Sequence, residues 1–252
     1  MRPGVRRGLI APHAGWTYSG DCAGRGYREL AGSAPSDIDL VVVFGSHRGP
    51  TGPNTVFVQD AWDTPLGPLK TELALAVETR RALSFAEEPV ELSGRPDNAV
   101  ELQLPFIRYF WPQARLLMLG VEASASAIEI GREVGERVRA GGHQAVFVGS
   151  TDLTHYGDNY GWAPRGGGPE ALRWVREVND AGFIDAVLRD DPARAVQHAL
   201  DHRSACCPGA TVAAMEAARA YAGALTPELV DHYTSHDVRP SPSFVGYASL
   251  VL

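Results

Sequence analysis

The stretch IDLVVVFGSHRGP, residues 38–50, decides how this chain folds. Ile38 and residues 40–44 supply six apolar side chains, and only Asp39 interrupts them. Such a run is typical of a strand whose two faces are both buried, as in a parallel sheet. The run ends in Gly45-Ser46-His47. A buried strand with this ending either reaches a surface turn or delivers an ionisable side chain to a site.

The rest of the chain alternates short apolar runs with segments of helical periodicity. The expected strands are residues 7–11, 38–44, 56–59, 115–120, 145–148, 229–234 and 243–251. The expected helices are residues 21–30, 72–83, 98–110, 126–139, 170–188, 193–200 and 209–221. Pro105 must lie in the first turns of its helix or kink it. This alternation predicts a single α/β domain, residues 1–252, built as a three-layer sandwich: a mixed, mostly parallel central sheet with helices on both faces.

The composition narrows the class of protein. A net charge of −7 argues against nucleic acid or an anionic membrane as the main partner. The three cysteines, Cys22, Cys206 and Cys207, are too few for a disulfide framework. No apolar run approaches the roughly 20 residues that span a bilayer. We therefore expect a cytoplasmic protein, and a homo-oligomer is compatible with the sequence.

Three of the expected strands run into segments that contain a histidine. These segments are PHAG at residues 12–15, GSH at 45–47 and STDLTH at 150–155. Ligands of open α/β sheets bind beyond the carboxyl ends of the strands, so His13, His47 and His155 can converge if their strands are parallel. A lone histidine at a strand end is more often a hydrogen-bonding residue, but three at equivalent positions favour a site. The remaining histidines that we expect to be solvated are His143, His198, His202 and His232.

A metal site at this edge needs a third donor, and Cys206 is the leading candidate. It precedes Pro208 and an alanine-rich helix, and a helix N-terminus lowers the pKa of a thiol. Two imidazoles and a thiolate suit Fe(II), Cu or Zn rather than Mg or Ca. Cys206 and Cys207 equally fit the alternative of small, buried apolar residues.

Six segments, taken together, resemble the Memo family in that family's order and over nearly the whole chain. They are APHAGWTYSG (11–20), GSH (45–47), TPLG (64–67), ELQLPF (101–106), STDLTHY (150–156) and VGYA (245–248). The Memo family is itself similar to the class III extradiol ring-cleaving dioxygenases, which fold as an α/β sandwich around a central sheet. The resemblance implies a metal held by His13, His47 and Cys206, with Asp152 and His155 as acid–base groups or as partners of the ligands.

Three positions depart from the family pattern. Asn98 stands where the family usually has histidine, and an amide donates a hydrogen bond but does not transfer a proton. His236 replaces a glycine and adds an imidazole at the expected rim of the site. Cys207 replaces the glycine that follows the family's cysteine, so the ligand could be Cys207 rather than Cys206.

The resemblance implies a non-heme, Fe(II)-dependent dioxygenase that cleaves the ring of a catechol-type or related small aromatic substrate with dioxygen; Cu or Zn are the alternative metals. In this hypothesis His155 takes and returns a substrate proton, Asp152 orients it, and Asn98 donates a hydrogen bond to substrate or dioxygen. The expected substrate walls are Trp16, Tyr18, Tyr156 and His236, although Tyr18 and Tyr156 fit plain core packing as well.

Two alternatives remain at this point. The Memo family also includes proteins described as signalling adaptors, so a non-catalytic metal-binding interaction protein is the second hypothesis. A third uses Cys206 as a nucleophile with a histidine base. The chain contains no Gly-x-Ser-x-Gly elbow and no dinucleotide-binding glycine pattern. A serine hydrolase or a dinucleotide-binding enzyme is therefore less favoured than the three hypotheses above.

Overall fold

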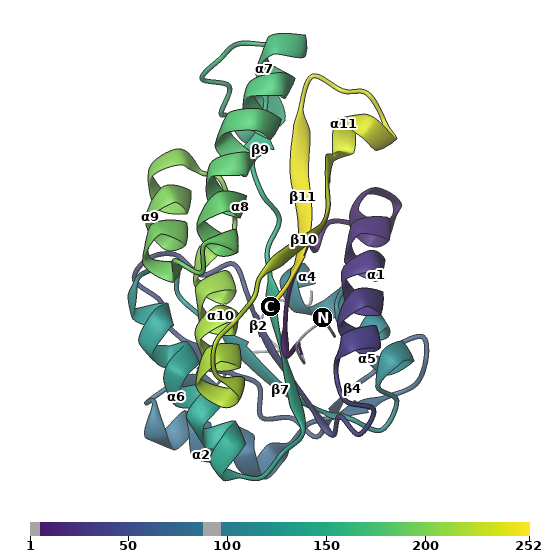
Figure 1. Cartoon of the computed structure of the whole chain (residues 1–252), viewed down its shortest axis with the longest axis vertical. Helices are drawn as coiled ribbons and strands as arrows, with labels where there is room; N and C mark the ends of the chain where they lie inside the picture. Colours follow the sequence, from purple (N-terminus) through teal and green to yellow (C-terminus); the bar gives the residue numbers. More distant parts are fainter. Residues whose placement is uncertain (1–5, 88–96) are drawn as a thin grey trace.

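The apolar run at residues 40–44 forms most of strand β2 (Leu40–Gly45) in the middle of the sheet (Figure 1). The structure is a computed structural model that describes residues 6–87 and 97–252. Every residue of β2 is buried. Val42 and Phe44 enter the core on one face of the sheet, whereas Val41 and Val43 enter the core on the other. The strand is therefore covered on both sides, as its composition predicts.

The centre of the sheet is parallel, and the strands on either side of it pair antiparallel except β6, which pairs parallel with β3. The parallel strands lie in the spatial order β1 (Gly8–Ala11), β8 (Ala145–Ser150), β2 and β7 (Arg115–Gly120). The flanking strands are β11 (Phe244–Val251) beside β1, β10 (Glu228–Thr234) and β9 (His155–Tyr156) beside β11, β3 (Thr55–Val56) beside β7 and β6 (Ala86–Glu87) beside β3. A separate two-stranded sheet consists of β4 (Ala61–Trp62) and β5 (Leu69–Lys70).

Helices cover both faces of the sheet, which confirms the predicted three-layer α/β architecture (Figure 1). One face packs against α2 (Leu73–Ala82), α6 (Ser126–Ala140), α8 (Ala181–Leu188), α9 (Pro192–His202) and α10 (Pro208–Ala222). The other face packs against α1 (Trp16–Ser33), α4 (Asn98–Glu101) and α5 (Leu104–Phe110).

Two expected helices are divided in the structure. Residues 98–110 form α4 and α5, and Pro105 lies in the first turn of α5, where its missing N–H costs no helical hydrogen bond. Residues 169–188 form α7 (Pro169–Trp174), a π-helical segment η2 (Val175–Asp180) and then α8. The short elements η1 (Asp158–Tyr160) and α11 (Ser235–Val238) were not expected, because periodicity needs a longer window to show.

Close packing between α6 and α10 fixes the start of α10. A Cβ on Gly131 would lie 2.3 Å from the carbonyl oxygen of Ala213, and one on Gly135 would lie 2.3 Å from that of Ala217. Glycine at these two positions lets the helices approach backbone to backbone. Because α10 begins directly after Cys207, this contact also sets the position of the two neighbouring cysteines.

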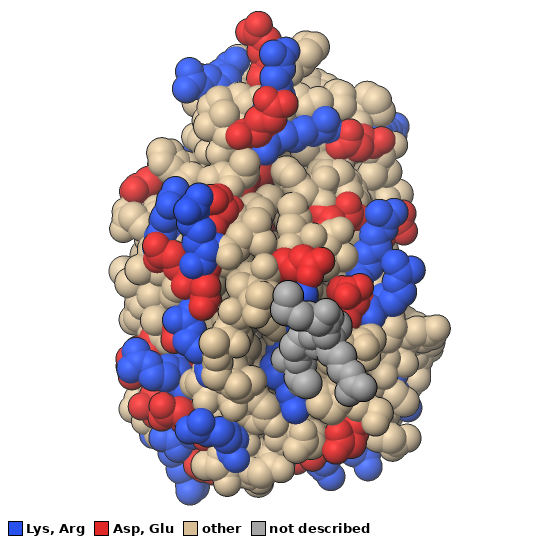
Figure 2. All heavy atoms as spheres, in the orientation of Figure 1, with Lys and Arg blue, Asp and Glu red and all other residues tan. Residues whose placement is uncertain are grey.

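Charged side chains of both signs are interspersed on the face shown in Figure 2. Ion pairs in the structure include Arg137 with Glu78 at 3.1 Å and Arg189 with Asp185 at 2.8 Å. Across residues 6–87 and 97–252, no helix has both the length and the apolar character that crossing a membrane requires.

Candidate metal centre

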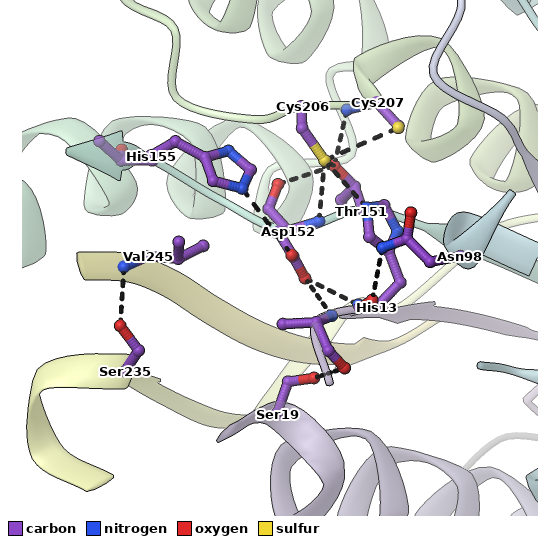
Figure 3. A network of polar contacts seen from close by, with 12 residues as sticks. His13, Ser19, Asn98, Thr151, Asp152, His155, Cys206, Cys207, Ser235 and Val245 are labelled. Atoms are coloured by element: carbon purple, nitrogen blue, oxygen red, sulfur yellow. Dashed lines mark hydrogen bonds and ion pairs between the residues drawn. The ribbon is translucent and has the colours of Figure 1, made fainter. Parts of the chain in front are cut away.

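Three neighbouring parallel strands deliver their carboxyl ends to one edge of the sheet. β1 leads into His13, β2 into His47 and β8 into Asp152, and the three strands lie side by side in the order β1, β8, β2. Ser46 adopts a left-handed backbone with φ of 73°, which turns the chain sharply between β2 and His47. Cys206 reaches the same place from the turn between α9 and α10 (Figure 3). The predicted convergence of residues far apart in the chain is therefore present.

His13, His47, Cys206 and Cys207 form a compact group of possible metal donors. Their ligand atoms all lie within 4.8 Å of one another. The Sγ of Cys206 is 3.2 Å from Nε2 of His13 and 3.6 Å from Sγ of Cys207. The ring centroids of His13 and His47 are 4.9 Å apart, with the rings almost perpendicular. Two imidazoles and one or two thiolates around one point make a donor set for a transition metal.

The other ring nitrogen of each histidine has a partner that orients the imidazole. Nδ1 of His13 is 2.9 Å from Oγ of the buried Ser150, and that oxygen accepts a hydrogen bond from Gln103 Nε2 at 3.0 Å. Nδ1 of His47 is 3.0 Å from a carboxylate oxygen of Asp97. With Nδ1 as the donor in both contacts, Nε2 is left for an ion, which is how metal-binding histidines are usually held.

Asp97 is a residue of the site that the sequence analysis missed. Its carboxylate accepts hydrogen bonds from the backbone N–H of His47 at 3.0 Å and from that of Ala99 at 2.9 Å. It therefore caps α4 and holds His47 at the same time. An aspartate just before a predicted helix is a recognised N-cap signal, and that signal would have marked the residue.

The charges of the group favour a thiolate beside imidazolium. Burial favours the neutral thiol of Cys206, but a hydrogen bond from Cys207 and the charge of His13 hold its pKa well below the usual range. The hydrogen bond to Asp97, and then the contact with Cys206, raise the pKa of His47 to about 10. The hydrogen bond to Cys206 and burial raise the pKa of Cys207. A metal ion binding here would displace these protons, so its affinity must rise with pH.

Asp152 links the ligands to one another. Its Oδ1 accepts hydrogen bonds from the backbone N–H groups of His13 at 2.7 Å and Ala14 at 3.2 Å. Its own N–H donates to Sγ of Cys206 at 3.2 Å, and its Oδ2 lies 4.0 Å from Nε2 of His155 (Figure 3). Burial raises the pKa of this carboxyl. Asp152 thus contacts His13 and Cys206 of the donor group and also lies near the imidazole of His155.

A cavity of about 650 Å³ lies next to the donor group. Asn98, Asp152, His155 and Tyr18 are among the residues that line it. Nδ2 of Asn98 donates to the carbonyl oxygen of His13 at 3.1 Å, which keeps one N–H of the amide for the cavity. The volume lies within the usual range for sites that bind small molecules.

Of the four side chains expected to wall a substrate, Tyr18 lines this cavity and the other three lie elsewhere. Tyr156 is buried in a separate aromatic core against Phe244, because neighbours on an extended strand point to opposite faces and His155 takes the site face. Trp16 is 46% exposed and lines a different hollow. Nδ1 of His236 contacts the backbone carbonyl oxygen of Ser241 at 2.8 Å and so braces a loop.

The expectation that His198 and His232 are simply solvated is wrong. Nδ1 of His198 is 2.8 Å from Oγ of the buried Ser204. Nε2 of His232 is 3.3 Å from Oδ2 of the fully buried Asp180. Sequence neighbours do not reveal such contacts, because they are made across elements.

Comparison with known proteins identifies the family of this chain. The profile of the family described as Memo-like protein matches residues 3–251. The chain belongs to the Memo family. A MEMO1 family protein of Methanococcoides burtonii is 30% identical over 248 residues, covering 97% of this chain and 86% of that protein. One from Pyrococcus abyssi is 32% identical over 254 residues, covering 96% and 85%.

A solved structure shares the fold. The crystal structure of an uncharacterized protein, JW3007, of Escherichia coli K12 superposes with a TM-score of 0.60 at 14% identity. The match covers 98% of this chain and 99% of that one. At this identity the likeness concerns the fold alone.

Proposed function

We propose that this Memo family protein is a non-heme, Fe(II)-dependent dioxygenase that acts on a catechol-type or related small aromatic substrate. The observation that supports the proposal is the junction of two features: a group of two histidines and a cysteine, and a cavity that begins beside it. Asp152 and Asn98 connect the two features, since each lines the cavity and forms a hydrogen bond with His13. Cys206 and Cys207 are both free thiols, which suits a reducing cytoplasm.

The donor set fits a metal ion. His13, His47 and Cys206 would hold it, because the ligand atoms are close together and each imidazole is already oriented through Nδ1. Fe(II) bound by three protein ligands supplies further positions for the two oxygens of a catechol and for dioxygen. The same donors also suit Cu or Zn.

The side chains on the cavity would handle the substrate. His155 would accept a proton from a substrate hydroxyl at Nε2 and return it, a role that suits imidazole. Oδ2 of Asp152, 4.0 Å from that nitrogen, would orient the ring and stabilise its protonated form. The remaining amide N–H of Asn98 would donate to a bound oxygen atom, and Tyr18 would cover one side of the substrate.

The test is oxygen consumption by protein that has been loaded anaerobically with Fe(II). We expect uptake that depends on an added catechol, and we expect both Cys206→Ala and His13→Ala to abolish it together with iron binding. His155→Gln should keep the iron and slow the uptake. His143→Gln, a change at a histidine that contacts Asp39 rather than the donor group, is the control. Uptake by the wild-type protein no greater than that of Cys206→Ala would refute the dioxygenase proposal.

A second candidate function is a metal-binding interaction protein without turnover, and Cys207 is the observation that favours it. Its sulfur is close enough to serve as a fourth donor, and a metal with four protein ligands has the closed coordination of structural sites. Cobalt(II) substitution separates the two cases. A tetrahedral spectrum with two thiolates, unchanged by added catechol, would favour the interaction protein.

A further inference from the structure

A short, restrained segment forms part of the cavity wall. Residues 239–243, with the sequence RPSPS, all line the cavity and connect α11 to β11. Pro240 and Pro242 limit the backbone, and Arg239 has the extended conformation that a following proline imposes (φ −145°, ψ 107°). The contact between Nδ1 of His236 and the carbonyl oxygen of Ser241, at 2.8 Å, ties the segment back to α11.

This segment lies on the same cavity as the acid–base groups. Val245, just after it in β11, pairs with His155 in β9, and both residues line the cavity. Figure 3 shows the backbone N–H of Val245 donating to Oγ of Ser235, at 3.0 Å, and Ser235 lines the cavity as well. A ligand that fills the cavity would therefore meet the 239–243 segment with one part and Asp152 and His155 with another.

Arg239 carries a positive charge on the wall of the cavity. Within the described parts of the chain, no acidic side chain forms an ion pair with it. Asp237, its nearest acidic neighbour in sequence, is engaged by Arg176 and by the backbone N–H of Thr234. The chain as a whole has a net charge of −7, whereas the guanidinium of Arg239 makes this part of the cavity wall positive.

The serines beside Arg239 add hydrogen-bond donors. Oγ of Ser243 accepts from the N–H of Asn159 at 3.2 Å, and Oγ of Ser241 accepts from the N–H of Ser243 at 3.2 Å. Each hydroxyl keeps its own hydrogen as a donor. A planar guanidinium with hydroxyl donors next to it matches a carboxylate in both charge and geometry.

We propose that Arg239, Ser241 and Ser243 bind a carboxylate group of the substrate. The substrate class is then a small aromatic acid whose hydroxyl-bearing end lies by Asp152 and His155, while its acid group lies against the 239–243 segment. The assignment of the reacting end rests on the proposed dioxygenase function, whereas the recognition of the carboxylate does not.

Binding in the absence of oxygen tests the proposal without relying on turnover. Calorimetric titration of the full chain would compare 3,4-dihydroxybenzoate with 3,4-dihydroxybenzamide, its uncharged counterpart of similar shape. We expect the wild-type protein to prefer the acid by about tenfold or more, which corresponds to about 1.4 kcal/mol. Arg239→Gln should remove the preference and leave binding of the amide unchanged, and Arg239→Lys should retain part of it.

Arg28→Gln is the matched control, because Arg28 is an exposed arginine on α1 outside the cavity lining. This variant should keep the wild-type preference. Equal binding of acid and amide by the wild-type protein, or an unchanged preference in Arg239→Gln, would overturn the carboxylate site, even if neutral catechols drive oxygen uptake. An Arg239-dependent preference without any oxygen uptake would instead uphold the site and refute the dioxygenase proposal.

Discussion

Sγ of Cys206 lies 3.2 Å from Nε2 of His13, although 193 positions separate the two residues in the chain. The sheet brings them together. β1 and β8 are neighbours, so His13 lies beside Asp152, and the backbone N–H of Cys206 donates to the carbonyl oxygen of Asp152 at 3.0 Å. The contact is therefore held by main-chain hydrogen bonds rather than by the side chains alone.

This geometry predicts that Cys206, not Cys207, is the essential ligand. Its sulfur is nearest to His13 and has a strongly lowered pKa, whereas the pKa of Cys207 is raised by its hydrogen bond to Cys206 and by burial. Cys206→Ala should lose bound metal, with at least about a hundredfold fall in affinity, because losing even a residue that only orients a ligand costs about 10–100-fold. Cys207→Ala should keep its metal within about tenfold of wild type.

Elemental analysis after dialysis against a metal buffer measures both variants. Cys22→Ala is the control, because this buried thiol contacts Ser249 and lies outside the donor group. Loss of metal from Cys207→Ala with retention in Cys206→Ala would reverse the assignment.

Much of the fold and part of the site follow from local patterns. Residues 40–44 are apolar without a break, which predicts a doubly buried strand, and the polar residues after three such strands predict where a site lies. These inferences hold because strand burial and the edge at which parallel strands end depend on short stretches of sequence. His13 and His47 are close in the structure for this reason.

Other features depend on contacts across elements, and no local pattern carries them. The direction of Tyr156 depends on which face of β9 meets the site, and the pairing of His232 with Asp180 joins β10 to η2. The π-helical turn at residues 175–180 has the same apolar spacing as an ordinary helix, so periodicity did not reveal it. Asp97 had a local signal as an N-cap, but nothing in the sequence indicated that the same carboxylate would hold His47.

The His47–Asp97 pair should make the stability of the metal-free protein depend on pH. The pKa of His47 rises from 6.5 to about 10 on folding, so its contribution is complete below pH 6.5 and disappears as the pH rises through about 10. Burial alone would raise the pKa of Asp97, but its hydrogen bonds with the side chain and backbone of His47 and with the backbone of Ala99 together lower it from 3.8. The contribution of Asp97 is therefore complete above that pH and is lost in stronger acid.

We therefore expect the stability difference between wild type and His47→Gln to be largest between about pH 4 and 6.5 and to shrink towards pH 10. Urea unfolding of the metal-free proteins across this range measures it. The stability difference between wild type and Asp97→Asn should likewise shrink towards pH 10, because this substitution removes the carboxylate that pairs with His47. Since the side chain of His47 is 43% exposed, added salt should weaken the effect. A difference that is constant from pH 5 to 10 would contradict the prediction.

Gly131 should be intolerant of even a methyl group. A Cβ there would lie 2.3 Å from the carbonyl oxygen of Ala213, which is backbone and cannot rotate away. Gly131→Ala should therefore destabilise the protein by about 1–3 kcal/mol, as overpacking does. Gly32→Ala is the matched control in α1, since no other group lies within 4 Å of its Cβ position, and it should be neutral or slightly stabilising. Denaturant unfolding of the two variants gives both values, and equal midpoints would show that α6 and α10 can separate without cost.

Asp180 should be needed to hold the segment that carries Asp152 and His155. It is fully buried, its Oδ1 accepts a hydrogen bond from the N–H of Thr154 at 3.2 Å, and its Oδ2 is 3.3 Å from Nε2 of His232. Gly246 makes room for it, because a Cβ there would lie 2.1 Å from Oδ2. Removing the carboxylate leaves buried donors without a partner, so Asp180→Ala should cost about 3–5 kcal/mol of stability.

Asp180→Asn keeps an oxygen acceptor for Thr154 and should cost less. Asp185→Ala, at an exposed carboxylate that pairs with Arg189, should change stability far less than either and serves as the control. Hydrogen exchange at the N–H of Thr154 reports on the segment itself and should accelerate in Asp180→Ala by more than in Asp185→Ala. If exchange at Thr154 is unchanged in Asp180→Ala, the segment is held by its main-chain bonds to Gly246 instead, namely Leu153 N–H to Gly246 O at 2.8 Å and Gly246 N–H to Thr154 O at 2.9 Å.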